Sequence, residues 1–155
     1  MSDKMKFTRH RQTGAAMIEM VVITPLLLLL LLGVSELGKA FIQYNTLNKS
    51  VREGAREVAS RALLGTTGTV LVTADLAAEA SNLVVYGNIA GTGSPRLPAL
   101  SVSHVSVTDA GNDMVLVQAD YPYIPLFGPV LETFGYGNEP GMNVTLTASV
   151  AMRAL

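Results

Sequence analysis

Glu19 is the residue of this chain whose type and position most need a chemical explanation. It is the only ionisable residue in a run of twenty largely apolar residues, 15–34. A carboxylate at the centre of a membrane helix costs about 2.5–3.5 kcal/mol, and less near the interface. Two interpretations follow. Glu19 either reaches the membrane surface from a shallow position, or it forms an ion pair with a partner group.

The other residues that could do chemistry form no catalytic or metal-binding pattern. The chain has no cysteine and only two histidines, His10 and His104. Asp109 and Asp113 flank an expected turn, but the ligand spacing of a calcium loop is absent. The sequence also lacks a glycine-rich phosphate loop and a nucleophile elbow. We therefore expect no enzyme activity, no metal, no cofactor and no small-molecule substrate.

The distribution of charge predicts the orientation of the chain. Residues 1–14 form a short basic leader with a net charge of +3, and since the whole chain carries −1, the remainder carries −4. An acidic remainder argues against nucleic-acid binding. Basic residues before the apolar run, with no dense basic cluster directly after it, place the N-terminus in the cytoplasm. The C-terminal part is then expected outside the cytoplasm.

Residues 15–34 are expected to form a transmembrane helix. Twenty helical residues rise about 30 Å, which matches the hydrocarbon core of a bilayer. Pro25 lies inside this span and removes one backbone hydrogen bond, so we expect a kink there. A cleaved secretory signal is the rival interpretation, with Gly38 and Ala40 as the small residues of its cleavage site. Its apolar region would normally be shorter than this one.

The helix is predicted to continue through residues 35–64 as an amphipathic segment. One apolar stripe recurs every three or four residues, formed by Leu37, Phe41, Tyr44, Leu47, Val51, Ala55, Val58 and Ala62. The charged residues on the other faces are interpreted mainly as a solvated surface. Lys49–Glu53 and Glu57–Arg61 are spaced for ion pairs along the helix. Gly65 is expected to end it.

Residues 65–98 are predicted to contain a short helix and a linker. Thr73 is a plausible N-cap for a helix that runs through Leu83. The turn-rich stretch 87–98 is the expected linker.

Residues 99–155 are expected to form a small antiparallel sheet of about three strands. The apolar alternation changes parity between Val102 and Val105, which predicts a β-bulge at Ser103 and His104. A hairpin turn is expected at 109–113. The second strand presents Val115, Val117, Ala119 and Tyr121 on one face. After a long connection at 122–141, the third strand presents Met142, Val144, Leu146, Ala148, Val150 and Met152.

These elements together predict an α+β fold. A three-stranded antiparallel sheet needs a cover for its apolar face, and the helix stripe from Val51 to Ala62 is the available one.

The N-terminal region resembles the TadE-like proteins, pseudopilins of the tight-adherence (Tad) branch of type IV pilus systems. The resemblance rests on TGAAMIEMVVITPLLLLLLLGVSELGKAF, residues 13–41, with its small residues at the Gly14–Ala15 junction and a glutamate five residues after it. It extends more loosely to AREVA (55–59) and to NVTLTASVAMR (143–153). The specific part covers about a quarter of the chain, and the expected fold is similar to that of type IV pilins.

The resemblance implies a processed subunit of a pilus. A prepilin peptidase would remove the leader by cutting between Gly14 and Ala15, and Glu19 would then pair with the amino terminus of a neighbouring subunit. The implied partners are the peptidase, other Tad pilins, the inner-membrane assembly platform and the lipid bilayer. The implied location is the inner membrane, with possible incorporation into an adhesive pilus that supports biofilm formation.

Two departures favour a minor pilin over the major filament subunit. Met20 follows Glu19 where the family pattern has an aromatic residue, and major pilins of this branch are much shorter. The alternative function is an unprocessed single-pass envelope protein with an external partner-binding domain.

Overall fold

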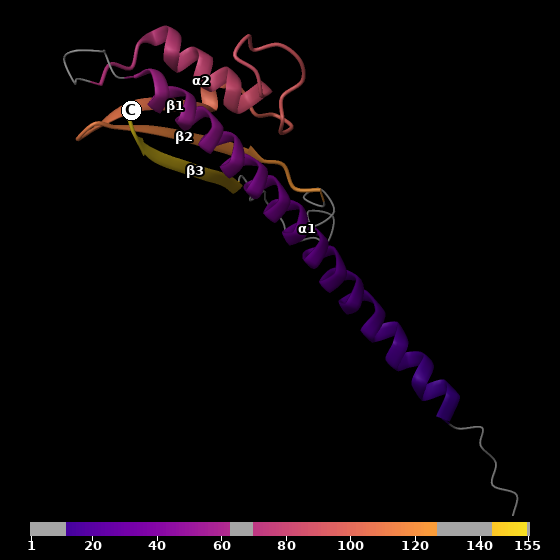
Figure 1. Ribbon diagram of the computed structural model, residues 1–155. Coiled ribbons are helices and arrows are strands. Elements are labelled where there is room, and N and C mark those ends of the chain that lie inside the picture. The colour runs from indigo at the N-terminus through magenta and orange to yellow at the C-terminus, as the bar shows by residue number, and fades with distance from the viewer. Residues whose placement is uncertain (1–11, 63–69, 127–143, 155) are drawn as a thin grey trace, which may run out of the picture. The chain divides into compact units, whose positions relative to one another are not determined.

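The described residues form two helices, a short 3-10 helix and one antiparallel sheet, as the predicted α+β class requires (Figure 1). The computed structural model describes residues 12–62, 70–126 and 144–154. The order of elements is α1 (Gln12–Arg61), α2 (Ala74–Tyr86), η1 (Val102–His104), β1 (Val105–Gly111), β2 (Met114–Tyr123) and β3 (Val144–Arg153). Two compact units divide the chain, Met1–Leu37 and Gly38–Leu155, and α1 contributes to both.

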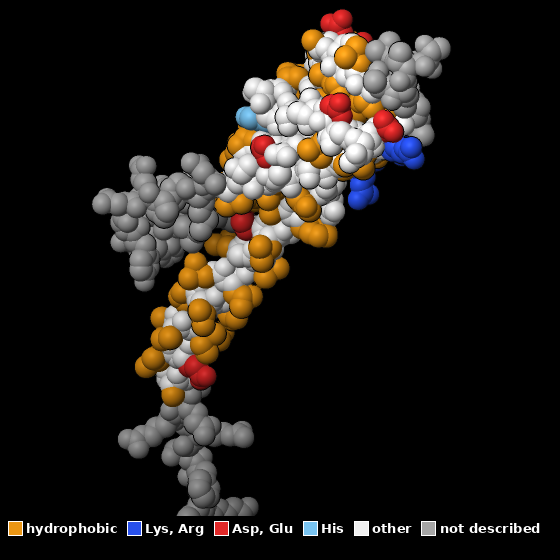
Figure 2. Space-filling model, turned by 90° about the vertical axis from the view of Figure 1, so that its left-hand side faces the viewer, with side chains coloured by type: hydrophobic (Ala, Val, Ile, Leu, Met, Phe, Trp, Pro, Cys, Tyr) orange, Lys and Arg blue, Asp and Glu red, His pale blue; other side chains and the backbone are white. Residues whose placement is uncertain are grey.

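The N-terminal unit consists, in its described part, of the first half of α1. All of its side chains from Gly14 to Leu31 are exposed, and hydrophobic side chains cover most of the face shown in Figure 2. Among the described residues, one helix, within Gly14–Arg61, is long and apolar enough to cross a membrane.

The sheet of the C-terminal unit has the strand order β1-β2-β3, with both pairs antiparallel. The hairpin between β1 and β2 turns at Asn112 and Asp113, whose φ angles of 53° and 60° are left-handed, as a two-residue hairpin loop of the primed type requires. Asp109 Oδ1 accepts a hydrogen bond from the Gly111 backbone N–H at 2.8 Å. The predicted turn is confirmed, and its aspartates help to shape it.

The core of the C-terminal unit lies between one face of the sheet and the two helices. Every second residue of β2 is buried from Val115 to Tyr123, and Ala148 of β3 joins them. The covering residues from α1 are Leu47, Val51, Ala55, Val58, Ala59 and Ala62, and those from α2 are Leu76, Ala80, Val84 and Val85. The inward faces predicted for the second and third strands are confirmed for the described residues, apart from Val144 at the start of β3, which is 45 % exposed. Met142 lies outside them.

A glycine allows α1 and α2 to approach closely. A Cβ atom on Gly54 would lie 2.6 Å from Val84 Cγ2 and 3.3 Å from the Ala80 carbonyl oxygen. Both distances are too short for ordinary packing, so only glycine fits here without a shift of α2. The predicted covering of the sheet by the helix stripe is correct, and α2 shares in it.

The short helix predicted after Thr73 is confirmed and extends to Tyr86. Thr73 Oγ1 accepts the Leu76 backbone N–H at 3.3 Å. At the other end, Gly87 adopts φ 78° and donates its N–H to the Leu83 carbonyl, a C-cap that favours glycine. The chain then returns along the helix, where the Arg96 N–H bonds to the Val85 carbonyl at 2.7 Å.

The predicted bulge at Ser103 and His104 is wrong. These residues belong to η1, and the strand begins only at Val105 instead of near residue 99. His104 Nδ1 accepts the Ser101 backbone N–H at 3.3 Å, which closes the turn. The change of parity in the sequence therefore marks a helical turn before the strand, and the irregular register lies at Asp109 and Gly111.

The apolar stripe of α1 covers the sheet from Leu47, one turn before the predicted start of the cover at Val51. Leu37, Phe41 and Tyr44 are exposed, and the core begins at Leu47. The helix ends at Arg61, four residues before Gly65. Gly65, most of the leader and most of the 122–141 connection lie outside the described residues.

Candidate functional site

Glu19 lies on an exposed turn of α1 among exposed apolar neighbours. Met17, Ile18, Met20 and Val21 all have more than half of their surface accessible. None of the hydrogen bonds or ion pairs that join described residues involves Glu19. The described part of the chain therefore brings no partner to this carboxylate.

Ala15 and Glu19 lie on one side of the helix. Residues four apart in an α-helix are neighbours on its surface, separated by a rise of about 6 Å. A positive charge located at Ala15 would thus lie within one turn of the Glu19 carboxylate.

Gly14 lies in the first turn of α1, and the packing of the chain does not require a glycine there. A Cβ atom at this position would meet nothing within 4 Å, in contrast to Gly54. The first turn of a helix also has backbone N–H groups without intrahelical acceptors, so it opens more readily than the helix interior. The Gly14–Ala15 bond is therefore in the part of α1 that unwinds most easily.

Pro25 lies inside α1 without ending it. The proline has no N–H to donate to the Val21 carbonyl four residues earlier. One residue before it, Thr24 Oγ1 donates to the Met20 carbonyl at 2.6 Å, a type of side-chain bond that often bends helices. The expected kink stays a prediction.

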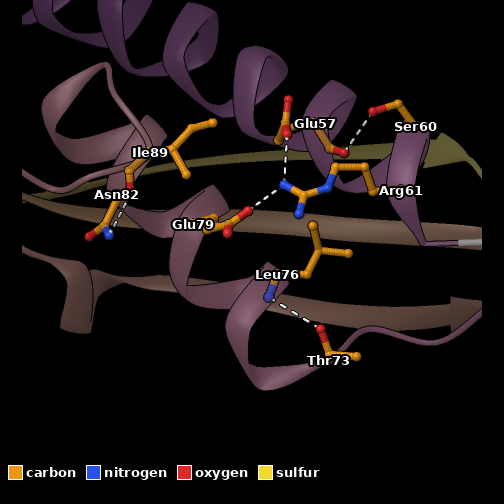
Figure 3. Close-up of polar contacts among 8 residues, drawn as sticks. All are labelled: Glu57, Ser60, Arg61, Thr73, Leu76, Glu79, Asn82 and Ile89. Carbon is orange, nitrogen blue, oxygen red and sulfur yellow. Dashed lines mark hydrogen bonds and ion pairs between the residues drawn. The ribbon is translucent and has the colours of Figure 1, made fainter.

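Arg61 joins the end of α1 to α2 through two carboxylates (Figure 3). Its Nη1 atom lies 3.1 Å from Glu57 Oε1 and also contacts Glu79 Oε2. The hydrogen bonds that Arg61 donates to Glu57 and Glu79 raise the pKa of its guanidinium above its usual value. The predicted pair of Glu57 and Arg61 is confirmed, and Glu79 is an addition that the sequence did not reveal.

An open pocket of about 390 Å³ lies beside this cluster. It is lined by Arg61, Leu71, Thr73, Asp75, Leu76 and Glu79. Arg61 already has two carboxylate partners, and Thr73 Oγ1 serves as the cap of α2. The polar groups that line the pocket are thus used in holding the two helices, and we assign no ligand to it.

Glu53 pairs with Arg96 and not with Lys49, so the prediction of a Lys49–Glu53 pair is wrong. Arg96 Nη1 lies 2.6 Å from Glu53 Oε2 and donates to Ser50 Oγ at 3.0 Å. Ser50 is buried, so the contact also satisfies a polar group in the interior. The interpretation of all these charges as a solvated face holds for Lys49, Arg52 and Arg56, which are exposed.

Asp120 is the centre of a small polar network on the outer face of the sheet. Its carboxylate accepts hydrogen bonds from Thr147 Oγ1 at 2.7 Å and from Gln118 Nε2 at 3.1 Å. The bond from Thr147, followed by that from Gln118, lowers the pKa of Asp120. On the opposite face, burial raises the pKa of the Tyr121 hydroxyl. We interpret the Asp120 carboxylate and the Tyr121 hydroxyl as structural groups of the sheet.

The described residues contain no cluster of three or more histidine, cysteine, aspartate or glutamate side chains that could hold a metal ion. Sequence reasoning identified the exposed carboxylate of Glu19 but missed the tertiary contacts of Glu53 and Glu79. Their partners lie 43 and 18 residues away along the chain, and no local spacing rule predicts such pairs.

Comparison with known families gives one match. The family model described as TadE-like protein matches residues 14–56. The matched segment begins at Gly14, contains Glu19 and Pro25, and ends two residues after Gly54. No curated protein and no solved structure matches the chain.

Proposed function

Since this chain belongs to the TadE-like family through residues 14–56, which links it to the Tad pilus system, we propose that it is a minor pilin. It would be processed after Gly14, be held in the inner membrane by residues 15–34, and take part in initiating or assembling an adhesive pilus. One observation carries the proposal. An apolar helical stretch within the family-matched segment exposes all of its side chains from Gly14 to Leu31 and places a lone carboxylate one turn after Ala15.

The local structure around Gly14 supports processing by a prepilin peptidase. Proteases act on an extended backbone, and the Gly14–Ala15 bond lies in the first turn of α1, where opening disrupts few hydrogen bonds. The space around Gly14 is empty, so its glycine serves no packing purpose within the chain. A requirement of the peptidase for a small residue at the scissile bond would explain it.

The Glu19 carboxylate is costly in an apolar environment on its own. Cleavage would create a positively charged group with which it can pair. The new α-ammonium group on Ala15 starts the helix, and a carboxylate in the first turn is favoured by the helix dipole. In an assembly, Glu19 would pair with the ammonium group of a neighbouring subunit. Pairing of this kind compensates for a charge in an apolar bundle and can fix the axial register of the helices.

The leader supports an orientation with the N-terminus in the cytoplasm. Its +3 charge precedes the apolar run, and the positive-inside rule then directs the C-terminal unit to the other side of the membrane. The other Tad pilins and the assembly platform would be the partners of the helix, and the bilayer would hold it until assembly.

A substitution of Glu19 tests this function in piliated cells. We expect Glu19→Leu to insert and to be cleaved after Gly14, and to fail in pilus assembly, because the ammonium group of the neighbour loses its partner. Met20→Leu is the matched control, since it changes the adjacent exposed side chain and no charge. Normal piliation by Glu19→Leu would refute the pairing role.

The same experiment separates the alternative function. The C-terminal unit has its own core, and this favours an unprocessed single-pass envelope protein with an external binding domain as the second candidate. Such a protein would keep its leader and would give no assembly defect in either variant.

A further inference from the structure

One end of the C-terminal unit exposes large apolar side chains from two distant segments. Phe41 and Ile42 of α1 are each 67 % exposed, and Ile124 and Leu126, which follow β2, are 52 % and 57 % exposed. The C-terminal unit has a buried core, yet these four apolar residues are exposed to solvent at one end of it. These four residues and Lys39 are called the collar.

Lys39 brings the two segments of the collar together. Its Nζ atom donates to the Ile124 carbonyl at 3.0 Å and lies 5.6 Å from the centre of the Tyr123 ring. These contacts place the end of β2 beside the first helical turn of the C-terminal unit. The apolar residues of both segments therefore lie at the same level of the unit.

The apolar side chains of the collar point in several directions around the helix. Lys39, Gln43 and Leu47 are four residues apart and face the sheet, where Gln43 Oε1 accepts from the Tyr121 hydroxyl at 3.4 Å. At about 100° per residue, Phe41 lies on the opposite side of the helix from Lys39, and Ile42 lies between the two. A single docked protein would cover one side. A surrounding apolar medium covers all of them.

We propose that the collar is embedded in the interfacial layer of the lipid bilayer while the protein resides in the membrane. The four apolar side chains of the collar would meet the outer part of the acyl chains at this depth, while Lys39 holds the two segments together through the Ile124 carbonyl. The collar also lies close to the apolar run along the same helix, because Phe41 follows Val34 by seven residues. The inference rests on the membrane span of the proposed function and needs neither cleavage nor pilus assembly.

Tryptophan fluorescence tests the inference directly, because the chain has no tryptophan of its own. The full chain is reconstituted in phosphatidylcholine and phosphatidylglycerol vesicles that contain phospholipids brominated near the headgroup. Ile124→Trp probes the collar. Ile89→Trp is the matched control, since Ile89 is also an exposed isoleucine of this unit, at 46 %. Leu29→Trp probes the span.

We expect the brominated lipid to quench Ile124→Trp several-fold more than Ile89→Trp, and also to quench Leu29→Trp. Equal and weak quenching of Ile124→Trp and Ile89→Trp, with Leu29→Trp quenched, would overturn the collar and leave the span intact. Blue-shifted emission of Ile124→Trp without quenching would mean that a second copy of the chain covers the collar, which also overturns it. An unquenched Leu29→Trp would refute the span and the collar together.

Discussion

The two units of this chain use the same helix in opposite ways. In the N-terminal unit, α1 exposes its leucines, and Leu31 keeps 64 % of its surface accessible. In the C-terminal unit the same helix buries Leu47 completely. The two halves also differ in composition, because residues 15–34 contain one ionisable residue, whereas the second half carries charged residues on the faces beside its apolar stripe. Among the described residues, all side chains from Gly14 to Leu31 are exposed, and an apolar surface of this kind fits the membrane and assembly contacts proposed above.

Truncation of a leucine in each unit gives the largest expected contrast. Leu47→Ala removes a fully buried side chain and should lower the free energy of unfolding of the C-terminal unit by about 2–5 kcal/mol. Leu31→Ala, in the exposed half, should change it by less than about 0.5 kcal/mol. Chemical denaturation of the detergent-solubilised chain measures both. Equal losses would mean that the two halves of α1 are not independent.

Glycine-to-alanine substitutions in the two halves of α1 should change the stability in opposite directions. Gly54→Ala places a methyl group against Val84 and Ala80, and overpacking of about 1–3 kcal/mol should exceed the gain of about 1 kcal/mol in helix propensity. Gly33→Ala, in the N-terminal unit, meets nothing within 4 Å, so it should stabilise the helix by up to about 1 kcal/mol. Denaturation midpoints of the two variants give the signs. Stabilisation by Gly54→Ala would refute the close contact of α1 with α2.

Acid titration should reveal a smaller change in stability, which comes from Asp120 in the sheet. Hydrogen bonds from Thr147 and Gln118 lower the pKa of Asp120 in the folded state. Its stabilising contribution is therefore present above the ordinary carboxyl pKa of about 4 and is lost as the pH falls through and below that value. Asp120→Asn should be slightly less stable at neutral pH and should show a flatter decline in stability below pH 4. Thermal unfolding across this range measures the slope. An unchanged slope would mean that Asp120 is not linked to folding.

The sequence was sufficient to predict the parts of the fold that depend on local rules. The alternation of Val115, Val117, Ala119 and Tyr121 predicted the buried face of β2, and the hydroxyl of Thr73 predicted the start of α2. Both follow from periodicity and capping, which involve residues a few positions apart. The position of Glu19 in an apolar run was likewise evident without a structure.

Contacts between distant segments decided the features that sequence reasoning missed. Arg96 reaches Glu53 across the loop that follows α2, and Lys49 consequently has no share in that pair. Phe41 fits the apolar stripe by spacing, yet the covering elements begin only at Leu47. His104 completes a turn with Ser101, and the sequence pattern around it resembled a bulge.

The mature N-terminus is the most direct test of the central claim that the exposed half of α1 is a processed pilin helix. The full chain is co-expressed with a prepilin peptidase, and its mass and N-terminal sequence are determined by mass spectrometry, with a peptidase-deficient strain as the control. We predict a mature chain that begins at Ala15 only when the peptidase is active. An intact leader in both strains, or a chain that begins at Phe41, would contradict the claim.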